Sequence, residues 1–503
     1  MENYNNRLLT QQAYESTLKN KEEVRKVKAE RFEKLSIGCL LYALFYTVCL
    51  YKNYAGITHP FFVGGTLCCF WHCLKKCGVT AKKGSIFLTV AMAILGIGIC
   101  TTDSAPLILL NKTAIVFLFC VLVLHSLYAD QEWSIYTYMK TIGCLLTGSL
   151  IKVFTPVSDF FSYISVKKSE CQKTVLNGDM LMKALIITAV FMTSIPFFFI
   201  LIFVLCSADT IFEELLADTF SMLLDFSRFR FHIQADVIGV IFTFCMVMGC
   251  CYGGMIYANN REKIGEITKK HVIEWKSYIA ITFTSVMAMI YVLFSFVQIF
   301  GLFLGCMKLP EGYTYAEYAR EGFFQLLFVC IFNIVVVLAI VGLFKMNKGL
   351  QIILSTISVC TLIMVISSAY RMILYISSYH LTFLRVFVLW TLLMIAFVMI
   401  GVITRIYKKE FGLFRYLLVV LTVGYIGFSM SHPDFWIAKY NLAKLEQGED
   451  VDTAYLYRHL SADAQFAFDG EIADEWGMKQ YSYEGVGDFR TINLSRLLAS
   501  ILD

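Results

Sequence analysis

The stretch from Phe383 to Thr404 reads FLRVFVLWTLLMIAFVMIGVIT and carries one charged residue, Arg385, close to its start. A helix needs about 20 mostly apolar residues to cross the hydrocarbon core of a bilayer. Similar stretches recur along most of the chain. Hydrophobic residues make up 58% of the sequence and charged residues 16%, whereas soluble domains contain roughly 45–50% and about 25%. The sequence therefore predicts an all-α integral membrane protein.

Hydropathy predicts about eleven transmembrane helices in total. Residues 135–166 are expected to form an interfacial or re-entrant segment, because Lys152, Pro156 and Asp159 interrupt its apolar run. The expected domains are a basic cytoplasmic helical arm at 1–34, a polytopic membrane domain at 35–430 and an acidic tail domain at 431–503. The predicted spans are 35–51, 57–74, 84–102, 107–128, 184–207, 236–257, 278–303, 319–344, 349–372, 383–404 and 412–430.

The distribution of charge predicts the orientation of the chain. The first 34 residues carry eight Lys or Arg, and the positive-inside rule therefore places the N-terminus in the cytoplasm. An odd number of crossings then places the C-terminus outside, where residues 431–503 carry thirteen Asp or Glu against six Lys or Arg. Further Lys/Arg-rich loops expected in the cytoplasm are 75–83, 167–183, 261–276, 345–348 and 405–415.

The tail is predicted to form a small helical extracytoplasmic cap. Asp434 precedes the run from Phe435 to Leu445, and its side chain is of the type that caps a helix N-terminus. Further short helices are expected at 451–460, 461–468 and 493–502, the last of them amphipathic. A domain of about 70 residues is marginally stable alone, so we expect the cap to rest on the membrane domain.

Sequence motifs of the common soluble enzymes are absent. The chain contains no G-x-x-x-x-G-K, H-E-x-x-H or G-x-S-x-G motif. Cys69, Cys73 and Cys77 share one helix stripe beside His72, a spacing that can bind a soft metal, but thiols in an apolar segment are better explained by packing. We therefore predict no catalytic residue, metal site or cofactor; enzymatic activity stays open, with a non-enzymatic role favoured.

Polar residues gather at the predicted outer ends of several spans, and desolvated charges at a membrane edge need partners. The first interpretation is a structural ion-pair network between helix ends, and the second is a polar vestibule for a ligand, a lipid headgroup or a proton. Inside the spans, Asn333 and Gln298 are expected to form hydrogen bonds between helices. The vestibule candidates are Glu317, Tyr318, Arg320, Glu321, Arg371, Tyr379, His380, Arg385 and Asp209.

Several short motifs resemble a bacterial family of polytopic membrane proteins, of the domain of unknown function 4153/4173 type. They are Ser207-Ala-Asp209, Tyr315-Ala-Glu-Tyr-Ala-Arg-Glu-Gly-Phe-Phe324, Tyr379-His-Leu-Thr382, Ala438-Lys-Tyr-Asn441 and Asn493-Leu-Ser-Arg496. The resemblance covers roughly residues 180–503. The chain departs from the family pattern at Thr210, where Pro is expected, and at His380, where Gly is expected. The resemblance implies a polytopic architecture and a bacterial cytoplasmic (inner) membrane location, but no activity.

Three classes of function fit the sequence. We favour an accessory, sensor or scaffold protein of the cell envelope, because a cap and a basic arm suit a fixed assembly. A secondary transporter or permease for a small solute or lipid would predict internal repeats and charges near the bilayer midplane. An enzyme acting on a lipid-linked substrate would need an acid of raised pKa, such as Glu317 or Glu321. The expected partners are membrane lipids and a cytoplasmic or envelope protein, and no nucleic acid.

Overall fold

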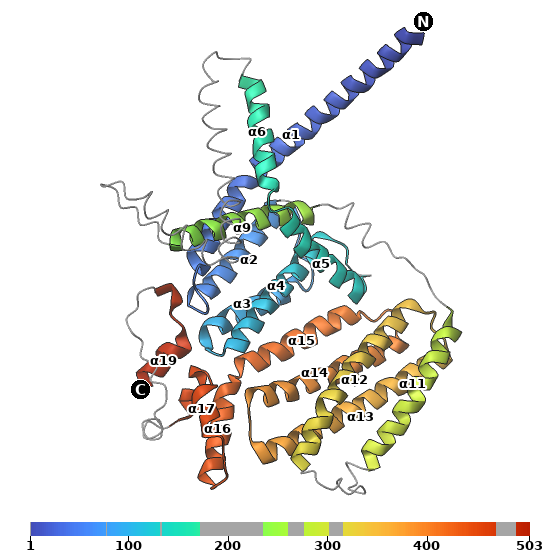
Figure 1. Cartoon of the computed structure of the whole chain (residues 1–503), viewed down its shortest axis with the longest axis vertical. Helices are drawn as coiled ribbons and strands as arrows, with labels where there is room; N and C mark the ends of the chain where they lie inside the picture. Colours follow the sequence, from blue (N-terminus) through green and yellow to red (C-terminus); the bar gives the residue numbers. More distant parts are fainter. Residues whose placement is uncertain are drawn as a thin grey trace, which may run out of the picture. The chain divides into compact units, whose positions relative to one another are not determined.

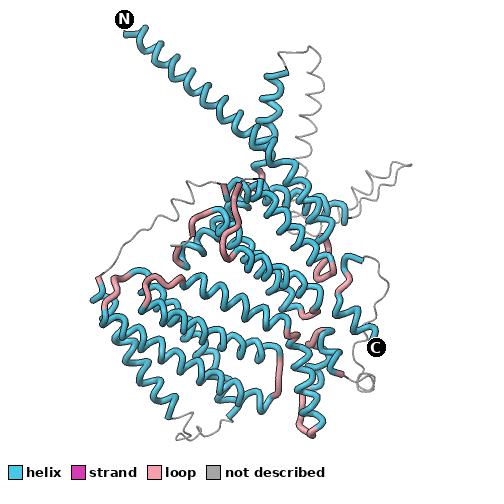
Figure 2. Tube along the Cα trace, turned by 180° about the vertical axis from the view of Figure 1, so that it is seen from behind, coloured by secondary structure: helices cyan, strands magenta, loops and turns pink. Residues whose placement is uncertain are grey.

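The computed structural model describes residues 2–76, 78–130, 133–171, 235–259, 276–300, 315–468 and 489–502, with side chains described except at 2–21, 169–171, 235–238, 315–322 and 502. The elements in this part of the chain are helices, with no strand among them (Figure 2). They divide into two compact units, the first formed by Met1–Lys52 with Gly143–Glu262 and the second by Asn53–Ile142 with Lys263–Asp503. We describe each unit by itself.

The first unit is built around the long helix α1 (Glu2–Leu50), which packs against α6 (Thr155–Cys171) and α9 (Ala235–Ala258) (Figure 1). Asp159 of α6 is fully buried and accepts hydrogen bonds from Nε and Nη2 of Arg31 at 2.7 and 2.8 Å. The hydroxyl of Tyr252 on α9 donates to the same carboxylate at 2.8 Å. This bidentate pair and its phenol tie the three helices together, because a buried carboxylate requires donors.

The predicted interfacial or re-entrant segment at 135–166 folds as two helices, α5 (Ile135–Ile151) and the first part of α6. The two are bent by 56° at the short break between them, a geometry typical of a broken span or a re-entrant loop. α5 begins in the second unit and ends in the first.

The second unit contains most of the apolar helices. Helices α11 to α15 lie side by side in it (Figure 1), and α3 packs on α2, α4 and α15. Leu354, Ile357 and Val402, all fully buried, form part of the core between α13 and α14. The helices that lie wholly within the second unit and outside the tail are α2 (Thr58–Lys76), α3 (Ser85–Thr101), α4 (Ala105–Leu127), α11 (Ser277–Gln298), α12 (Tyr315–Leu343), α13 (Lys348–Tyr379), α14 (Phe383–Tyr407) and α15 (Leu413–Met430).

Eight of the described helices are long and apolar enough to cross a membrane, or up to nine if the bent α5–α6 pair is one span. They match eight of the eleven predicted spans. The predicted spans 57–74 and 84–102 correspond to α2, which is not among the eight, and to α3, which is a shorter apolar helix of 17 residues. The predicted span 184–207 lies outside the described residues. The total of about eleven and the side on which each terminus lies stay predictions.

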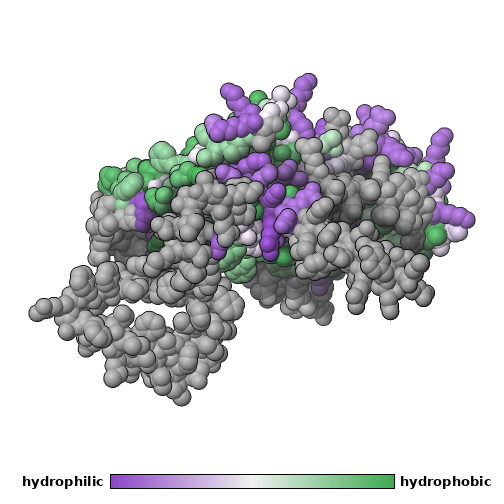
Figure 3. Space-filling model, turned by 90° about the horizontal axis from the view of Figure 1, so that it is seen from above, coloured by the Kyte–Doolittle hydropathy of each residue, from purple (hydrophilic) through white to green (hydrophobic). Residues whose placement is uncertain are grey.

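Large apolar side chains remain exposed along these helices, as expected of surfaces that face lipid. On α11, Phe283, Met289 and Leu293 are 57%, 69% and 68% exposed. On the face of the molecule seen in Figure 3, apolar side chains gather in patches beside separate groups of polar ones. The described part of the chain is therefore helical throughout its regular elements and has membrane character.

The described part of the tail is helical, as predicted, in short pieces that follow α15. The prediction that Asp434 is an N-cap residue is wrong. The N-cap position of α16 is occupied by His432, and Asp434 lies inside the helix with its carboxylate bonded to Ser461 instead. The tail elements are α16 (Pro433–Glu446), α17 (Thr453–Arg458), the 3₁₀ helices η2 (Ala462–Ala467) and η3 (Phe489–Thr491), and α19 (Leu494–Leu502).

Candidate functional site

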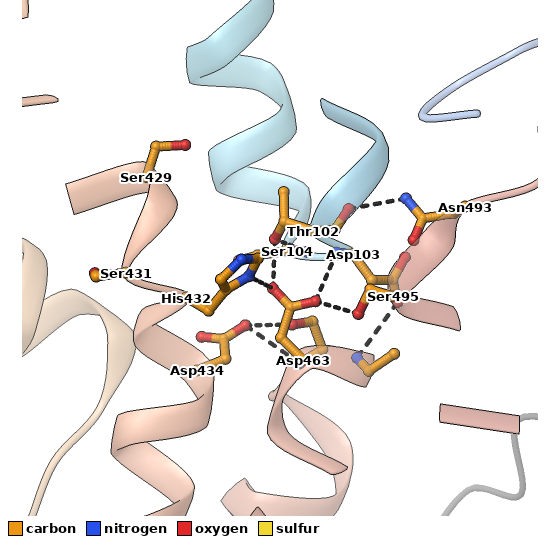
Figure 4. Close-up of polar contacts among 12 residues, drawn as sticks. Thr102, Asp103, Ser104, Ser429, Ser431, His432, Asp434, Asp463, Asn493 and Ser495 are labelled. Atoms are coloured by element: carbon orange, nitrogen blue, oxygen red, sulfur yellow. Dashed lines mark hydrogen bonds and ion pairs between the residues drawn. The ribbon is translucent and has the colours of Figure 1, made fainter. Parts of the chain in front are cut away.

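A cluster of polar side chains, most of them buried, lies where the tail meets the apolar helices of the second unit (Figure 4). The turn between α3 and α4, the junction of α15 and α16, the 3₁₀ helix η2 and the start of α19 all contribute to it. We call this cluster the Asp463 joint; its residues are Thr102, Asp103, His432, Asp434, Asp463, Asn493, Ser495 and Arg496.

Asp463 is the centre of the joint, and it is 2% exposed. Its Oδ2 accepts from the Thr102 hydroxyl at 2.5 Å and lies 3.2 Å from Nδ1 of His432. Its Oδ1 accepts from the backbone N–H of Asp103 at 3.0 Å and from the hydroxyl of Ser495. An ionised carboxylate offers about four acceptor positions, so protein groups from three separate segments fill them.

These contacts decide the protonation of the central pair. Burial alone would raise the pKa of Asp463, but the hydrogen bonds from His432, Ser495 and Thr102 outweigh it and hold that pKa below its ordinary value. The hydrogen bond to Asp463 raises the pKa of His432, against the opposite effect of burial. His432 has a φ of 48°, in the left-handed region that turns the chain from α15 into α16. Both shifts favour the charged forms of the pair, a carboxylate and an imidazolium.

Asp434 and Asp103 flank this pair in a different electrostatic state. Burial raises the pKa of Asp434, although the hydroxyl of Ser461 donates to its Oδ2 at 2.6 Å. Burial also raises the pKa of Asp103, although Nε of Arg496 lies 2.6 Å from its Oδ1. The surroundings thus favour the charged forms of Asp463 and His432 and the neutral forms of Asp434 and Asp103.

Asn493 extends the joint to the chain before α2. Its Nδ2 donates to the carbonyl oxygens of Ala55 at 3.0 Å and of Thr102 at 2.9 Å. Its Oδ1 accepts from the backbone N–H of Arg496 at 3.2 Å, which caps the first turn of α19. One side chain therefore starts the last helix and binds it to two loops that are distant in sequence.

The centre of the joint is a buried carboxylate with its donors and the half-buried imidazole of His432. The hydroxyls of Ser495 and Ser461 donate to the carboxylates of Asp463 and Asp434, and each carboxylate accepts further hydrogen bonds as well. Within the described ranges, no group of three or more His, Cys, Asp or Glu side chains is arranged to hold a metal ion. The arrangement can connect segments and hold protons.

The residues of the predicted vestibule are only partly described. The side chains of Glu317, Tyr318, Arg320 and Glu321 lie outside the described residues, as does Asp209. The backbone of the first four belongs to the beginning of α12. Whether these acids pair with arginine or form a vestibule therefore stays a prediction.

Two of the predicted arginines occupy different environments. Arg371 is 5% exposed, and its Nη2 donates to Oε1 of Gln298 at 3.2 Å. Arg385 is half-buried; its Nη1 donates to the carbonyl oxygens of Tyr379 and His380, and its guanidinium lies 4.5 Å from the ring centroid of Tyr375. The structure brings Tyr379, His380 and Arg385 together and places Arg371 inside the helix packing.

The loop at His380 has an unusual backbone, with a φ of 61° at that residue. Only glycine adopts such a conformation without steric cost. Glycine, the residue expected here from the family pattern, therefore suits this position better than histidine. The imidazole Nε2 lies 3.0 Å from the carbonyl oxygen of Asp450, and Nδ1 lies 3.8 Å from Glu449. The side chain therefore connects the α13–α14 loop to the tail.

The two polar residues inside spans contact neighbouring helices. Nδ2 of Asn333 on α12 donates to the hydroxyl of Thr361 on α13 at 2.9 Å. Oε1 of Gln298 on α11 accepts from Ser367 on α13 at 2.7 Å in addition to Arg371. Both side chains lie in helix interfaces, where such bonds are worth about 1 kcal/mol.

Nothing in the sequence singles out the centre of the joint. Asp463 and Thr102 are 361 residues apart, and neither belongs to a motif with a known spacing. The available signals were Thr102-Asp-Ser104 between two apolar helices and the Asn493-Leu-Ser-Arg496 run in the tail. Neither signal identifies its partner, because the contact exists only after the helices have packed.

The comparisons with known proteins bear on the family alone. No curated protein and no solved structure matches the chain. One family, described as a domain of unknown function (DUF4153), matches residues 89–469. The match begins before the region of roughly 180–503 that the short motifs indicated. It includes the residues of the joint from Thr102 to Asp463 and ends before Asn493. The chain belongs to the DUF4153 family of proteins that contain this domain of unknown function.

Proposed function

We propose that the protein is an accessory, sensor or scaffold protein of the bacterial cytoplasmic membrane, with its C-terminal helices fixed as a cap on the outer ends of the membrane helices. The observation that carries the proposal is the buried carboxylate of Asp463, whose acceptor positions are filled by donors from the α3–α4 turn, the α15–α16 junction and α19. Opening such a joint would leave a charge and its donors without partners, which is costly. The joint therefore supports a rigid cap.

A permease would require polar groups near the bilayer midplane that are alternately opened to the two sides. Asn333 and Gln298, the two intramembrane polar residues singled out from the sequence, are engaged with Thr361, Ser367 and Arg371 of α13. Among the described residues, the titratable groups of the joint lie at helix ends and in loops instead. These features favour a static membrane domain over an alternating one.

The partners we propose are membrane lipids and a protein of the cytoplasm or envelope. The predicted orientation leaves the cap outside and the basic start of α1 inside, so a partner could bind either end. Arg31 pairs with Asp159 within the first unit, whereas Arg25 and Lys26 are exposed on α1 and are candidates for an anionic partner.

The test of the proposal separates a scaffold from a permease. We would reconstitute the purified full chain in liposomes that enclose a pH-sensitive dye and compare it with the Asp463→Asn and Asp450→Asn variants. Asp450 is an exposed acid of the same cap and serves as the matched control. We expect proton flux equal to that of empty liposomes for all three proteins.

In cells that lack the native copy, we expect Asp463→Asn to lose the wild-type phenotype together with cap stability, and Asp450→Asn to retain both. If the wild type conducts protons and Asp463→Asn abolishes that flux, the protein is a permease and not a scaffold. Turnover of a lipid-linked substrate by the purified wild type would replace the scaffold by an enzyme.

A further inference from the structure

Three membrane helices of the second unit enclose a small pocket away from the Asp463 joint. The pocket lies between α12, α13 and α14 and has a volume of about 170 Å³. Phe323, Met372 and Val388 form its inner wall, and these side chains are 1%, 6% and 6% exposed. The wall is therefore apolar and well packed behind the opening.

The pocket lies at the level where the spans end. Phe323 is the first residue of the apolar part of α12, α13 ends at Tyr379, and α14 begins at Phe383. The rim carries Phe324 and Leu384, which are 57% and 59% exposed. Exposed apolar side chains at a span end are placed to contact lipid chains close to the headgroups.

Arg385 provides the polar end of the pocket lining. Its guanidinium is held over the ring of Tyr375, and its Nη1 is committed to two backbone carbonyls. A guanidinium has five N–H donors, so three remain on Nε and Nη2. In the part of the chain with described side chains, no carboxylate forms an ion pair with Arg385, and the remaining fork of donors matches a phosphate.

The size of the pocket limits what enters it. A cavity of about 150 Å³ lined by apolar side chains accommodates a molecule the size of benzene, whereas sites for drug-sized ligands measure about 300–1,000 Å³. A pocket of about 170 Å³ therefore fits a segment of one hydrocarbon chain better than it fits a whole solute.

We infer that this pocket binds an anionic phospholipid, with a segment of one acyl chain between Phe323, Met372 and Val388 and with the phosphate at the guanidinium of Arg385. The apolar wall favours the acyl chain, and the guanidinium at the rim favours an anionic headgroup. The inference stands on the pocket alone and does not depend on the role proposed for the cap.

The experiment uses the full chain in a neutral detergent, with phosphatidylglycerol or phosphatidylcholine of identical acyl chains added. Native mass spectrometry counts the bound lipids and gives their relative affinities. We expect the wild type to prefer phosphatidylglycerol and Arg385→Gln to bind it about fivefold more weakly, which is the contribution of one basic side chain at an anionic membrane surface. Val388→Phe fills the pocket and should weaken the binding of both lipids.

Lys348→Gln is the matched control, because Lys348 is an exposed cation at the opposite end of α13, and it should leave the preference unchanged. A diazirine-labelled phosphatidylglycerol should cross-link the wild type on peptides that contain Phe323, Met372 or Val388, which tests the site even if a variant fails to fold.

Labelling only on other helices, or equal binding of both lipids by the wild type, would overturn the inference. Inorganic phosphate that competes as strongly as the lipid would assign Arg385 to a free anion and would also overturn it.

Discussion

Replacing Asp463 by Asn tests how strongly the tail is held, because the change keeps the size of the side chain and removes its charge. Asn replaces one acceptor oxygen by an NH₂ group that faces a donor. The side chain is 2% exposed, so water does not compensate the mismatch. An unsatisfied buried donor costs about 1–3 kcal/mol, and the lost charge-assisted bond to His432 costs about 1.5–3 kcal/mol. Together these give about 2.5–6 kcal/mol for a fully buried pair. Because the His432 side chain is 35% exposed, solvent screening reduces its share, and we expect about 2.5–4 kcal/mol.

The assay is hydrogen exchange of the backbone amides in η2 and α19, the two tail elements that carry Asp463 and Ser495 of the joint. Because about 1.4 kcal/mol changes an equilibrium tenfold, local opening of α19 should become about 10²- to 10³-fold more frequent in Asp463→Asn. Asp450→Asn, the same chemical change at an exposed site of the cap, should leave the exchange rates within about twofold of the wild type. Equal exchange in the two variants would refute the reasoning.

Three further predictions follow from the geometry of the second unit. The stabilisation from the central pair should be largest between pH 3.8 and 6.5, the ordinary pKa values of Asp and His. The contribution of Asp463, whose pKa is lowered, is lost as the pH falls through its folded value. The contribution of His432, whose pKa is raised, is lost as the pH rises through its folded value. The pKa values of Asp103 and Asp434 are raised, so their stabilisation is present below pH 3.8 and is lost as the pH rises through their folded values. After correction for the base-catalysed intrinsic exchange rate, the opening of α19 should be less frequent at pH 6 than at pH 8, because His432 loses its stabilisation as the pH rises. A corrected opening free energy that is flat in this range would contradict the assignment. Gly56→Ala should destabilise the tail by about 1–3 kcal/mol, because a Cβ there would meet the backbone of Arg490 and Thr491. Gly64→Ala is the control, because a Cβ at that position in α2 meets open space. Equal thermal stability of the two variants would show that the contact at Gly56 is loose. His380→Gly should raise the free energy of unfolding by about 1 kcal/mol, because the strain energy released at a φ of 61° exceeds the energy of the lost hydrogen bond to the Asp450 carbonyl. A melting temperature below that of the wild type would show that the side-chain contact dominates.

The sequence predicted the apolar helices well because the bilayer imposes one requirement on each of them separately. A span such as Phe383–Tyr407 must satisfy its backbone within itself and present apolar side chains to lipid, and both conditions are local. The α3 helix (Ser85–Thr101) agrees with the predicted span at 84–102 to within one residue at each end, where Gly84 with a φ of 97° precedes it and the turn at Thr102 follows it. Single residues are harder to assign, as Asp434 shows, since a residue suited to an N-cap binds Ser461 instead.

By itself, the sequence determined that the chain is a helical membrane protein and where most apolar helices begin and end, because hydrophobicity and backbone hydrogen bonding are properties of one segment at a time. Only the tertiary structure decided which polar groups meet. Asp463, Thr102, His432 and Ser495 come from four positions without any common motif, and Arg385 becomes the rim of a pocket only when α12, α13 and α14 are packed. A buried carboxylate takes its donors from whatever the packing brings within reach, and that reach is a property of the folded chain.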